Sequence, residues 1–418
     1  MAEAGNSGAG TFPEIRVPAA LTFAALLVGF AVGIALRGSA LLDPVLAVAE
    51  PAGSLWLRAL QLTILPLVIG LVVTGISQTL AAAGGGALAR RAVGLFVAVL
   101  LASGMMAALL VPALLAMFPV PPSAAQALAG GGVPDPGKVP GFADILSAMM
   151  PENIFAAAAE GKMLPVVVFA SLFALALTRI GAEPRAVMTR FFEALAAAMM
   201  VIVGWVLLLA PVGVLGLAIS LGAHTGAEAI GALAHYIVVV SSAGLVVLIA
   251  GFALAAVLGG QRIGDFARAM VPVFAVAIST QSSLASLPAM LSATRRLGVR
   301  DATADFVLPL AVAIFRGTSP AMNMGVAIYA AHLTGTPLSA AALMAGVFVA
   351  FLVSLSSVSL PGTLSFVISV GPIAMAMGVP IAPLALLVAV EMLPDIMRTL
   401  GNVTMDVAVT SAVDRGHD

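Results

Sequence analysis

The chain has 418 residues, of which 61% are hydrophobic and only 9% are charged, and its formal net charge is −1. Soluble proteins carry about 25% charged residues, so this composition excludes an ordinary soluble domain, and the near-neutral charge gives no sign of nucleic-acid binding. The absence of cysteine excludes disulfides, thiolate metal sites and cysteine nucleophiles. The composition therefore predicts an integral membrane protein.

Apolar segments long enough to cross the roughly 30 Å hydrocarbon core of a bilayer recur along the whole chain. Residues 18–36 form the first of them, after an N-terminal tail of residues 1–17. Arg37 follows where a signal peptide would have small residues for cleavage, so we expect a retained membrane span.

The arginines predict how these spans are oriented. An arginine pair at 90–91 lies between the second and third apolar segments, and clusters follow at 179–190, 262–268 and 295–300. The connections between these clusters are poor in arginine, and the long one, 119–152, is rich in Pro and Gly. By the positive-inside rule, the arginine-bearing loops and both termini are cytoplasmic, and 119–152 is an external loop.

Two later segments break the pattern of uninterrupted spans. Segment 263–297 has a polar run at 279–283 in the middle of an apolar stretch, and arginines flank both of its ends. Segment 338–378 has a serine-rich run ending in Pro-Gly at 354–362. The serines could instead serve tight helix packing, with proline as a kink. Because paired interrupted segments mark transporter binding sites, we expect two re-entrant helical hairpins.

The polar residues near the C-terminus form one stripe. Glu391, Asp395, Arg398, Asn402 and Asp406 are spaced four, three, four and four residues apart, which aligns them on one face of a helix. A charge at the bilayer centre costs about 2.5–3.5 kcal/mol. A charged face in an otherwise apolar segment therefore predicts a substrate site within the membrane.

Short motifs spread along the chain carry a family resemblance. They are Leu65-Pro66-Leu67-Val68, Pro151-Glu152-Asn153-Ile154-Phe155, Gly161-Lys162-Met163-Leu164-Pro165, Ala210-Pro211-Val212-Gly213, Ser282-Ser283, Leu287-Pro288, Leu308-Pro309-Leu310 and Pro361-Gly362. The most specific is the D-x-x-R-T-x-x-N-V-T-x-D pattern from Asp395 to Asp406. From about residue 50 to 412, the chain resembles the dicarboxylate/amino-acid:cation symporter family, which includes the glutamate transporters and their prokaryotic homologues.

The resemblance implies an all-α polytopic membrane protein with eight transmembrane helices and two re-entrant hairpins, assembled as a homotrimer. A scaffold would surround a transport domain that moves like an elevator. The implied divisions are an N-terminal tail (1–17), scaffold helices 1–2 (18–90), transport-domain helix 3 (91–118), an external loop (119–152), scaffold helices 4–5 (153–222), the transport-domain core (223–413, with hairpins at about 263–297 and 338–378) and a C-terminal tail (414–418).

The resemblance also implies roles for individual residues. Arg398 matches the arginine that holds the substrate's side-chain carboxylate, and Asp395 matches the residue that binds its α-amino group. Further implied substrate contacts are Thr399, Asn402, Gln281, Ser282, Ser283, Ser357, Pro361 and Gly362. Asn402 and Asp406 match sodium ligands, since a hard cation prefers oxygen donors. Arg398 could alternatively form an internal salt bridge with Asp395 or Glu391.

The chain departs from the family pattern in the seventh span. There the family has an Asn-Met-Asp-Gly-Thr motif that ligates sodium, whereas this chain has Phe-Arg-Gly-Thr-Ser at 315–319. Asn323 with its following Met-Gly falls eight residues late, and we interpret it as a coincidence. The motif's asparagine and aspartate are thus absent, and Arg316 stands in their place.

This departure leads to a hypothesis about the coupling ion. Arg316 would act as a tethered cation that replaces at least one sodium by pairing with Asp406, Asp395 or Glu391, since each unpaired buried charge is costly. Glu391 and Asp395 could also share one proton. The coupling ion could therefore be H⁺ or Na⁺. Alternatively, Arg316 faces the scaffold or the membrane surface, and sodium binds elsewhere.

The sequence as a whole predicts an inner-membrane symporter for a small acidic solute, such as aspartate, glutamate or succinate, with no other cofactor. An intramembrane hydrolase would need a nucleophile or a metal cluster, and the four histidines do not supply one. An uncoupled exchanger or anion channel with the same fold stays open, as does a sensor that has lost transport.

Overall fold

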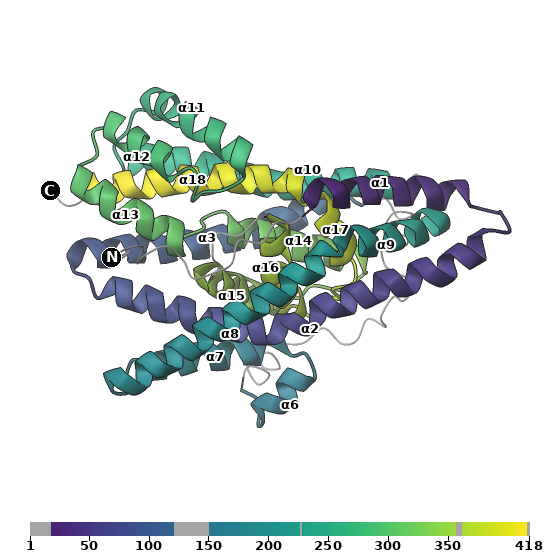
Figure 1. The fold of residues 1–418 in the computed structure, drawn as a ribbon. Helices are drawn as coiled ribbons and strands as arrows, with labels where there is room; N and C mark the ends of the chain where they lie inside the picture. Colours follow the sequence, from purple (N-terminus) through teal and green to yellow (C-terminus); the bar gives the residue numbers. More distant parts are fainter. Residues whose placement is uncertain (1–17, 121–149, 226–227, 357–361, 416–418) are drawn as a thin grey trace, which may run out of the picture.

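The computed structural model describes residues 18–120, 150–225, 228–356 and 362–415, and every regular element among them is a helix (Figure 1). The helices are α1 (Ala19–Ala35), α2 (Leu42–Ala83), α3 (Ala87–Met117), α6 (Ile154–Ala159), α7 (Met163–Leu177), α8 (Ala182–Leu208), α9 (Ala210–Thr225), α10 (Glu228–Val257), α11 (Ile263–Thr280), α12 (Leu287–Arg296), α13 (Asp301–Ile314), α14 (Ser319–Leu333), α15 (Ala340–Ser356), α16 (Gly362–Ala376), α17 (Leu384–Val390) and α18 (Met392–Arg415).

The outer helices have the composition of membrane spans. Five of them, α2, α3, α8, α10 and α11, are long and apolar enough to cross a bilayer, and four shorter apolar helices accompany them. Large apolar side chains on their outer faces are exposed, for example Leu62 at 78% and Leu109 at 77%. Such surfaces belong in lipid, because a soluble protein does not leave extended apolar faces in water. The expected all-helical membrane protein is confirmed at this level.

The helices pack in two groups that meet at α2. In the first, α1 packs against α9, and α2 packs against α7, α8 and α9. In the second, α10 lies alongside α18, α3 lies against α14, and α11, α12 and α13 all contact α18 (Figure 1). α15 and α16 join the groups, because each contacts both α2 and α14.

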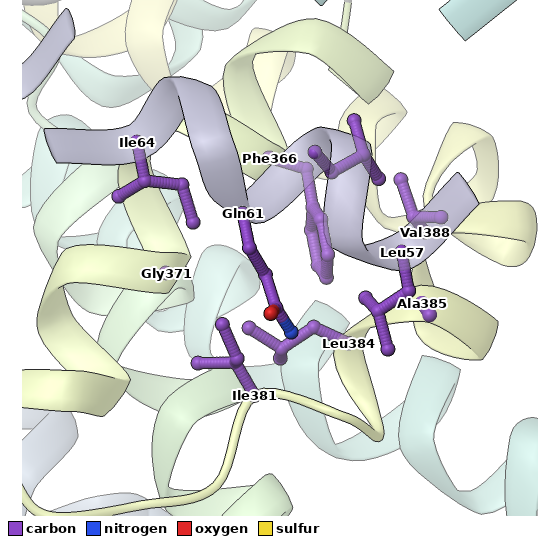
Figure 2. A pocket seen from close by; sticks show the side chains of 10 residues that line it. Leu57, Gln61, Ile64, Phe366, Gly371, Ile381, Leu384, Ala385 and Val388 are labelled. Carbon is purple, nitrogen blue, oxygen red and sulfur yellow. The ribbon is translucent and has the colours of Figure 1, made fainter. Parts of the chain in front are cut away.

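A cavity lies where α2 faces α16 and α17 (Figure 2). Its lining is apolar except for Gln61, whose amide projects into it beside Phe366 and Leu384. The packing between α2 and the α16–α17 region is therefore incompletely filled at this point, unlike a close-packed protein interior.

The seventh apolar segment is interrupted between α13 and α14. Phe315 is extended, with φ −117° and ψ 119°, and ends α13. Pro320 lies in the first turn of α14, where its missing N–H leaves no helical hydrogen bond unmade. The ring of Phe315 stacks on Phe96 of α3, with 4.5 Å between centroids, which fixes the break against a neighbouring helix. Residues 315–318 consequently present backbone groups to the protein interior.

The first expected hairpin corresponds to α11 and α12, which pack against each other across a short loop. Gln281 turns the chain there in the left-handed conformation (φ 49°, ψ 35°), which non-glycine residues seldom adopt. Ser282 accepts two hydrogen bonds inside the loop: its Oγ atom accepts from the Ala285 N–H, and its backbone carbonyl accepts from the Ser286 hydroxyl. In the second expected hairpin, α15 and α16 pack together, Gly362 begins α16, and Ser357 and Pro361 lie outside the described residues.

The C-terminal end of α18 is fastened to the start of α13. Arg300 Nε donates to Asp414 Oδ1 at 2.8 Å, and the Thr303 hydroxyl donates to the same oxygen at 2.7 Å. Burial alone would raise the pKa of the Asp414 carboxyl, but these hydrogen bonds hold the pKa below its ordinary value. We call this arrangement the Asp414 clamp.

Candidate functional site

The polar stripe lies at the centre of the second helix group. Asp395, Arg398, Asn402 and Asp406 lie on α18, and Glu391 occupies the single position between α17 and α18. Asp395 N–H donates to the Glu391 carbonyl at 2.9 Å, so the helical register continues through the junction and Glu391 stays on the same face. All five residues are at most 4% exposed. The sequence spacing thus becomes one buried row of polar groups.

Arg398 is the centre of a three-residue ion cluster. Its Nη1 atom lies 2.5 Å from Glu391 Oε1 and 2.8 Å from Asp395 Oδ1. Its Nη2 atom donates to Asn323 Oδ1 at 3.5 Å, a long contact. Its Nε atom makes no hydrogen bond within the described part of the chain. One corner of the guanidinium is therefore neutralised, while the Nε–Nη2 edge keeps donors that a carboxylate could accept in a bidentate manner.

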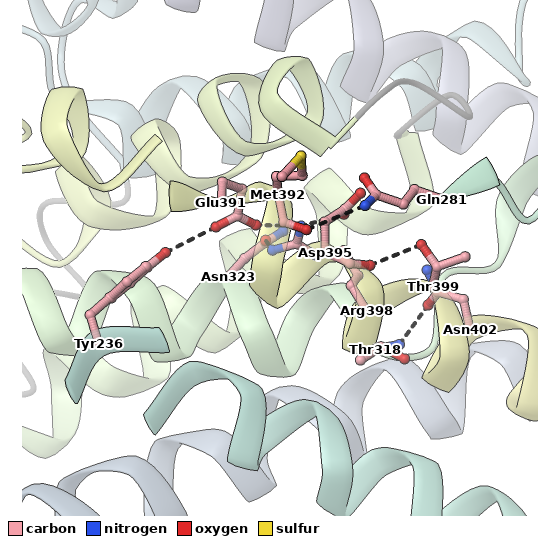
Figure 3. Close-up of polar contacts among 10 residues, drawn as sticks. All are labelled: Tyr236, Gln281, Thr318, Asn323, Glu391, Met392, Asp395, Arg398, Thr399 and Asn402. Carbon is pink, nitrogen blue, oxygen red and sulfur yellow. Dashed lines mark hydrogen bonds and ion pairs between the residues drawn. The ribbon is translucent and has the colours of Figure 1, made fainter. Parts of the chain in front are cut away.

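Tyr236 of α10 completes the cluster on the side of Glu391. Its hydroxyl donates to Glu391 Oε2 at 3.0 Å, so the carboxylate has a different partner at each oxygen. Figure 3 shows these contacts running from Tyr236 through Glu391 to Arg398. Since α10 packs along α18, the contact ties Glu391 to a second helix.

Asn402 lies against the break in the seventh segment. Its Oδ1 atom accepts a hydrogen bond from the Thr318 backbone N–H at 2.9 Å. Gly401 allows this approach, because a Cβ at that position would lie 2.3 Å from Thr318 Oγ1. Thr399, by contrast, donates its hydroxyl to the carbonyl of Asp395 in its own helix at 2.9 Å. Asn402 therefore connects α18 to the non-helical backbone.

Asp406 lies one helical turn beyond Asn402 and is 0% exposed. Neither of its carboxylate oxygens makes a hydrogen bond within the described residues. Arg316, in the break between α13 and α14, is 7% exposed and interacts electrostatically with Asp406 and with Asp395. Carboxylate oxygens without hydrogen bonds, beside the amide of Asn402, form an oxygen donor set that suits a hard cation or a fixed positive charge.

A hydrogen bond joins the loop of the first hairpin to the start of α18, in addition to the packing of α11 and α12 against α18. Gln281 Nε2 donates to the backbone carbonyl of Met392, at the start of α18, at 3.4 Å (Figure 3). Ser282 and Ser283 in the same loop are half-buried. The structure thus brings Gln281 to the start of α18, next to Glu391 in the sequence, whereas Ser282 accepts hydrogen bonds within its own loop.

Sequence reasoning missed three residues that touch the stripe: Tyr236, Thr318 and Asn323. Asn323 was interpreted only as a coincidental likeness to the family motif, yet its amide contacts Arg398 and so lies beside the stripe. Two signals were present in the sequence. Asn323 is an amide residue within a largely apolar segment, and Tyr236 is one of only two tyrosines in the chain. Thr318 contacts Asn402 through its backbone N–H, and a backbone contact of this kind cannot be predicted from a pattern of residue types.

A bundle of apolar helices around a buried charged row defines an integral membrane protein with a polar site inside it. The model of the sodium:dicarboxylate symporter family matches residues 19–416, and the chain belongs to this family. The family resemblance predicted from the motifs is thereby confirmed. Membership also places the chain in a family of transporters rather than of enzymes.

The curated relatives are bacterial transport proteins of low identity. C4-dicarboxylate transport protein 1 of Pseudomonas paraeruginosa is 27% identical over 279 residues, which cover 66% of this chain and 62% of that protein. The proton/sodium-glutamate symport protein of Bacillus subtilis is 29% identical over 268 residues, covering 61% and 59%. The corresponding protein of Bacillus caldotenax is 28% identical over 255 residues, covering 61% and 60%. The chain thus spans about three fifths of the length of each of these relatives.

Proposed function

We propose that this chain is a secondary active transporter that carries a small acidic solute across the cytoplasmic membrane. The solute would be an acidic amino acid, such as aspartate or glutamate, or a C4-dicarboxylate, such as succinate. The observation that carries the proposal is the buried Arg398, whose Nε–Nη2 edge keeps hydrogen-bond donors while Glu391 and Asp395 hold its other corner. A planar guanidinium suits bidentate carboxylate binding better than any other side chain.

Substrate recognition follows from the groups around that edge. Arg398 would bind one substrate carboxylate, and Asp395 would bind the ammonium group of an amino-acid substrate. Asn402, Thr399 and the first hairpin tip (Gln281, Ser282 and Ser283) would complete the site, with Ser357, Pro361 and Gly362 contributed from the second hairpin. The contact of Gln281 with Met392 supports this arrangement, since it joins the first hairpin to the start of α18.

The proposed mechanism is an elevator within a homotrimer. Scaffold segments 18–90 and 153–222 would stay fixed while 91–118 and 223–413 move with the substrate. The packing of α3 on α14 and of α10 on α18 supports this division, as does the cavity between α2 and the α16–α17 region. Eight spans, two re-entrant hairpins and cytoplasmic termini complete the proposed topology.

We propose that solute transport is coupled to the movement of H⁺, or of Na⁺ through an altered sodium site. Asp406 has no hydrogen-bond partner among the described residues, and Arg316 is the cation whose charge acts on it. A guanidinium held there would supply permanently the positive charge that a bound sodium supplies reversibly. Arg316 is thus proposed as a tethered cation that replaces at least one sodium, with Asn402 and Asp406 retaining the oxygen donors for any cation that still binds.

An uncoupled exchanger is the second candidate. The loss of the motif asparagine and aspartate in the seventh segment favours it, because a carrier that binds no coupling ion exchanges its substrate without concentrating it. An anion channel with the same fold would likewise fail to concentrate the solute.

Uptake into proteoliposomes tests the proposal. The purified chain should take up labelled aspartate, glutamate or succinate, and an excess of the unlabelled acidic solute should compete, whereas a neutral amino acid should not. If the chain is an exchanger, vesicles preloaded with unlabelled solute should take up labelled solute faster than empty vesicles do. If it is a symporter, an imposed ion gradient should drive uptake into vesicles that were not preloaded. Uptake of none of the three acidic solutes, by vesicles that contain folded protein, would refute the proposed substrate class.

A further inference from the structure

The contacts of Arg398 impose a charge balance on substrate binding. Around the site the described residues carry two positive side chains, Arg398 and Arg316, and three carboxylates, Glu391, Asp395 and Asp406. With every group ionised, this cluster has one excess negative charge. A substrate carboxylate that binds Arg398 adds another negative charge to groups that are almost completely buried. Uncompensated charges of this kind are costly in a site that excludes water.

Glu391 is the carboxylate best arranged to relieve this excess. Its Oε2 atom faces the hydroxyl of Tyr236, which donates to an ionised carboxylate and can rotate to accept from a protonated one. Either state of Glu391 therefore keeps a hydrogen bond on that side. Among the described residues, no hydroxyl group donates to the carboxylate of Asp395, whose Oδ1 atom instead accepts from Arg398 Nη1.

Few other charged or titratable groups lie close enough to Glu391 to affect its protonation. Among the described residues, the charged or titratable groups that act on it are Arg398 and Asp395 from α18 and Tyr236 from α10. Tyr236 packs edge-on against Tyr329, with 5.3 Å between ring centroids, and the Tyr329 hydroxyl lies 3.1 Å from His235 Nδ1. His235 is half-buried, so titratable side chains extend from Glu391 toward the protein surface.

We infer that binding of the acidic substrate at Arg398 is linked to uptake of one proton by Glu391, with Tyr236 as the hydrogen-bond partner of both protonation states. The inference rests on the proposed function and names its coupling ion at this site. In this step the acid form of the bulk buffer gives a proton to a carboxylate oxygen of Glu391 and is left as its conjugate base. Protonation removes one of the two negative charges on the Nη1 corner, so the guanidinium can attract the substrate carboxylate more strongly.

Binding of succinate to the purified full-length protein tests the inference by isothermal titration calorimetry. Succinate has no amino group, and both of its carboxyl groups are ionised above about pH 7.5, so pH effects from there to about pH 8.5 come from the protein. Titrations in buffers of different ionisation enthalpy give the number of protons taken up. The expected result is one proton per succinate, with affinity falling up to about tenfold per pH unit as the pH rises.

Variants separate Glu391 from other groups. Glu391→Gln should bind succinate with no proton uptake and with an affinity that stays flat with pH. Glu183→Gln, at an exposed position in the first turn of α8, is the matched control and should behave like the wild type. Tyr236→Phe should shift the pH at which affinity changes, and it serves as the second variant if Glu391→Gln does not fold.

The possible outcomes distinguish the two proposals. Succinate binding without proton uptake, or the wild-type pH dependence retained in Glu391→Gln, would overturn the inference alone. An unshifted pH dependence in Tyr236→Phe would overturn the role of that hydroxyl. If the wild type binds neither succinate nor aspartate, the proposed function fails and the inference fails with it.

Discussion

Replacing Arg398 with methionine tests whether the guanidinium holds the substrate or only forms an internal salt bridge. Methionine has a similar length and suits the apolar surroundings, so the substitution removes the charge with little change in volume. Arg398 contacts two buried carboxylates, Glu391 at 2.5 Å and Asp395 at 2.8 Å. Removing one partner of a buried ion pair costs about 3–5 kcal/mol of stability, so Arg398→Met should unfold at a markedly lower temperature.

The effect on binding is separable from the effect on stability. Loss of one partner of a buried, hydrogen-bonded charge pair costs about 2–5 kcal/mol of binding free energy, which corresponds to roughly 30-fold to a few thousand-fold in Kd. In the double variant Glu391→Gln/Arg398→Met, one carboxylate no longer needs a cation. The double variant should therefore regain part of the unfolding temperature that Arg398→Met loses, but none of the lost affinity for substrate.

Calorimetric titration with aspartate and succinate, together with thermal unfolding of the same samples, measures both effects. Arg185→Met, at an exposed position of α8, is the control for loss of an arginine. A folded Arg398→Met protein that binds both solutes within about threefold of the wild-type Kd, a change of less than about 1 kcal/mol, would refute the reasoning. Arg398 would then be an internal salt-bridge residue.

Three other substitutions test neighbouring features. Arg316→Met should make substrate affinity depend on sodium, measured by titration with and without it; unchanged ion dependence and affinity would contradict the tethered cation. Gly401→Ala should lower thermal stability by about 1–3 kcal/mol through overpacking, because its Cβ would lie 2.3 Å from Thr318 Oγ1; a Gly401→Ala protein as stable as the wild type would disprove that contact. Asp414→Asn removes a carboxyl whose pKa is lowered by hydrogen bonds from Arg300 and a neighbouring threonine. The wild type should therefore unfold at a higher temperature than Asp414→Asn above about pH 5, and this difference should begin to shrink near about pH 4 and disappear only below the lowered pKa of Asp414 in the folded protein; a difference that does not shrink as the pH falls below about 4 would contradict the Asp414 clamp.

The sequence predicts features that depend on one helix or on composition. Hydropathy identifies the membrane helices because burial in lipid requires long apolar segments. The stripe from Asp395 to Asp406 follows from helical spacing alone, and Glu391 stays aligned because α18 continues the register across the junction. These features need no knowledge of which helices are neighbours.

The contacts between helices could not be predicted in the same way. Tyr236 precedes Glu391 by 155 residues, and their hydrogen bond depends on α10 lying along α18. Asn323 was set aside because its position did not match a motif, yet the break before α14 orients its amide toward Arg398. Spacing along the chain carries no information about such tertiary contacts, which arise only when separate helices pack.

Accumulation of substrate in proteoliposomes tests the central claim most directly. Labelled aspartate and succinate are supplied outside vesicles with an imposed inward proton or sodium gradient, and the ratio of internal to external concentration is followed for the wild type and Arg398→Met. A coupled transporter that binds its substrate at Arg398 should concentrate one of these solutes above the external level, and Arg398→Met should not. Equilibration without accumulation under both gradients, or equal accumulation by Arg398→Met, would contradict the claim.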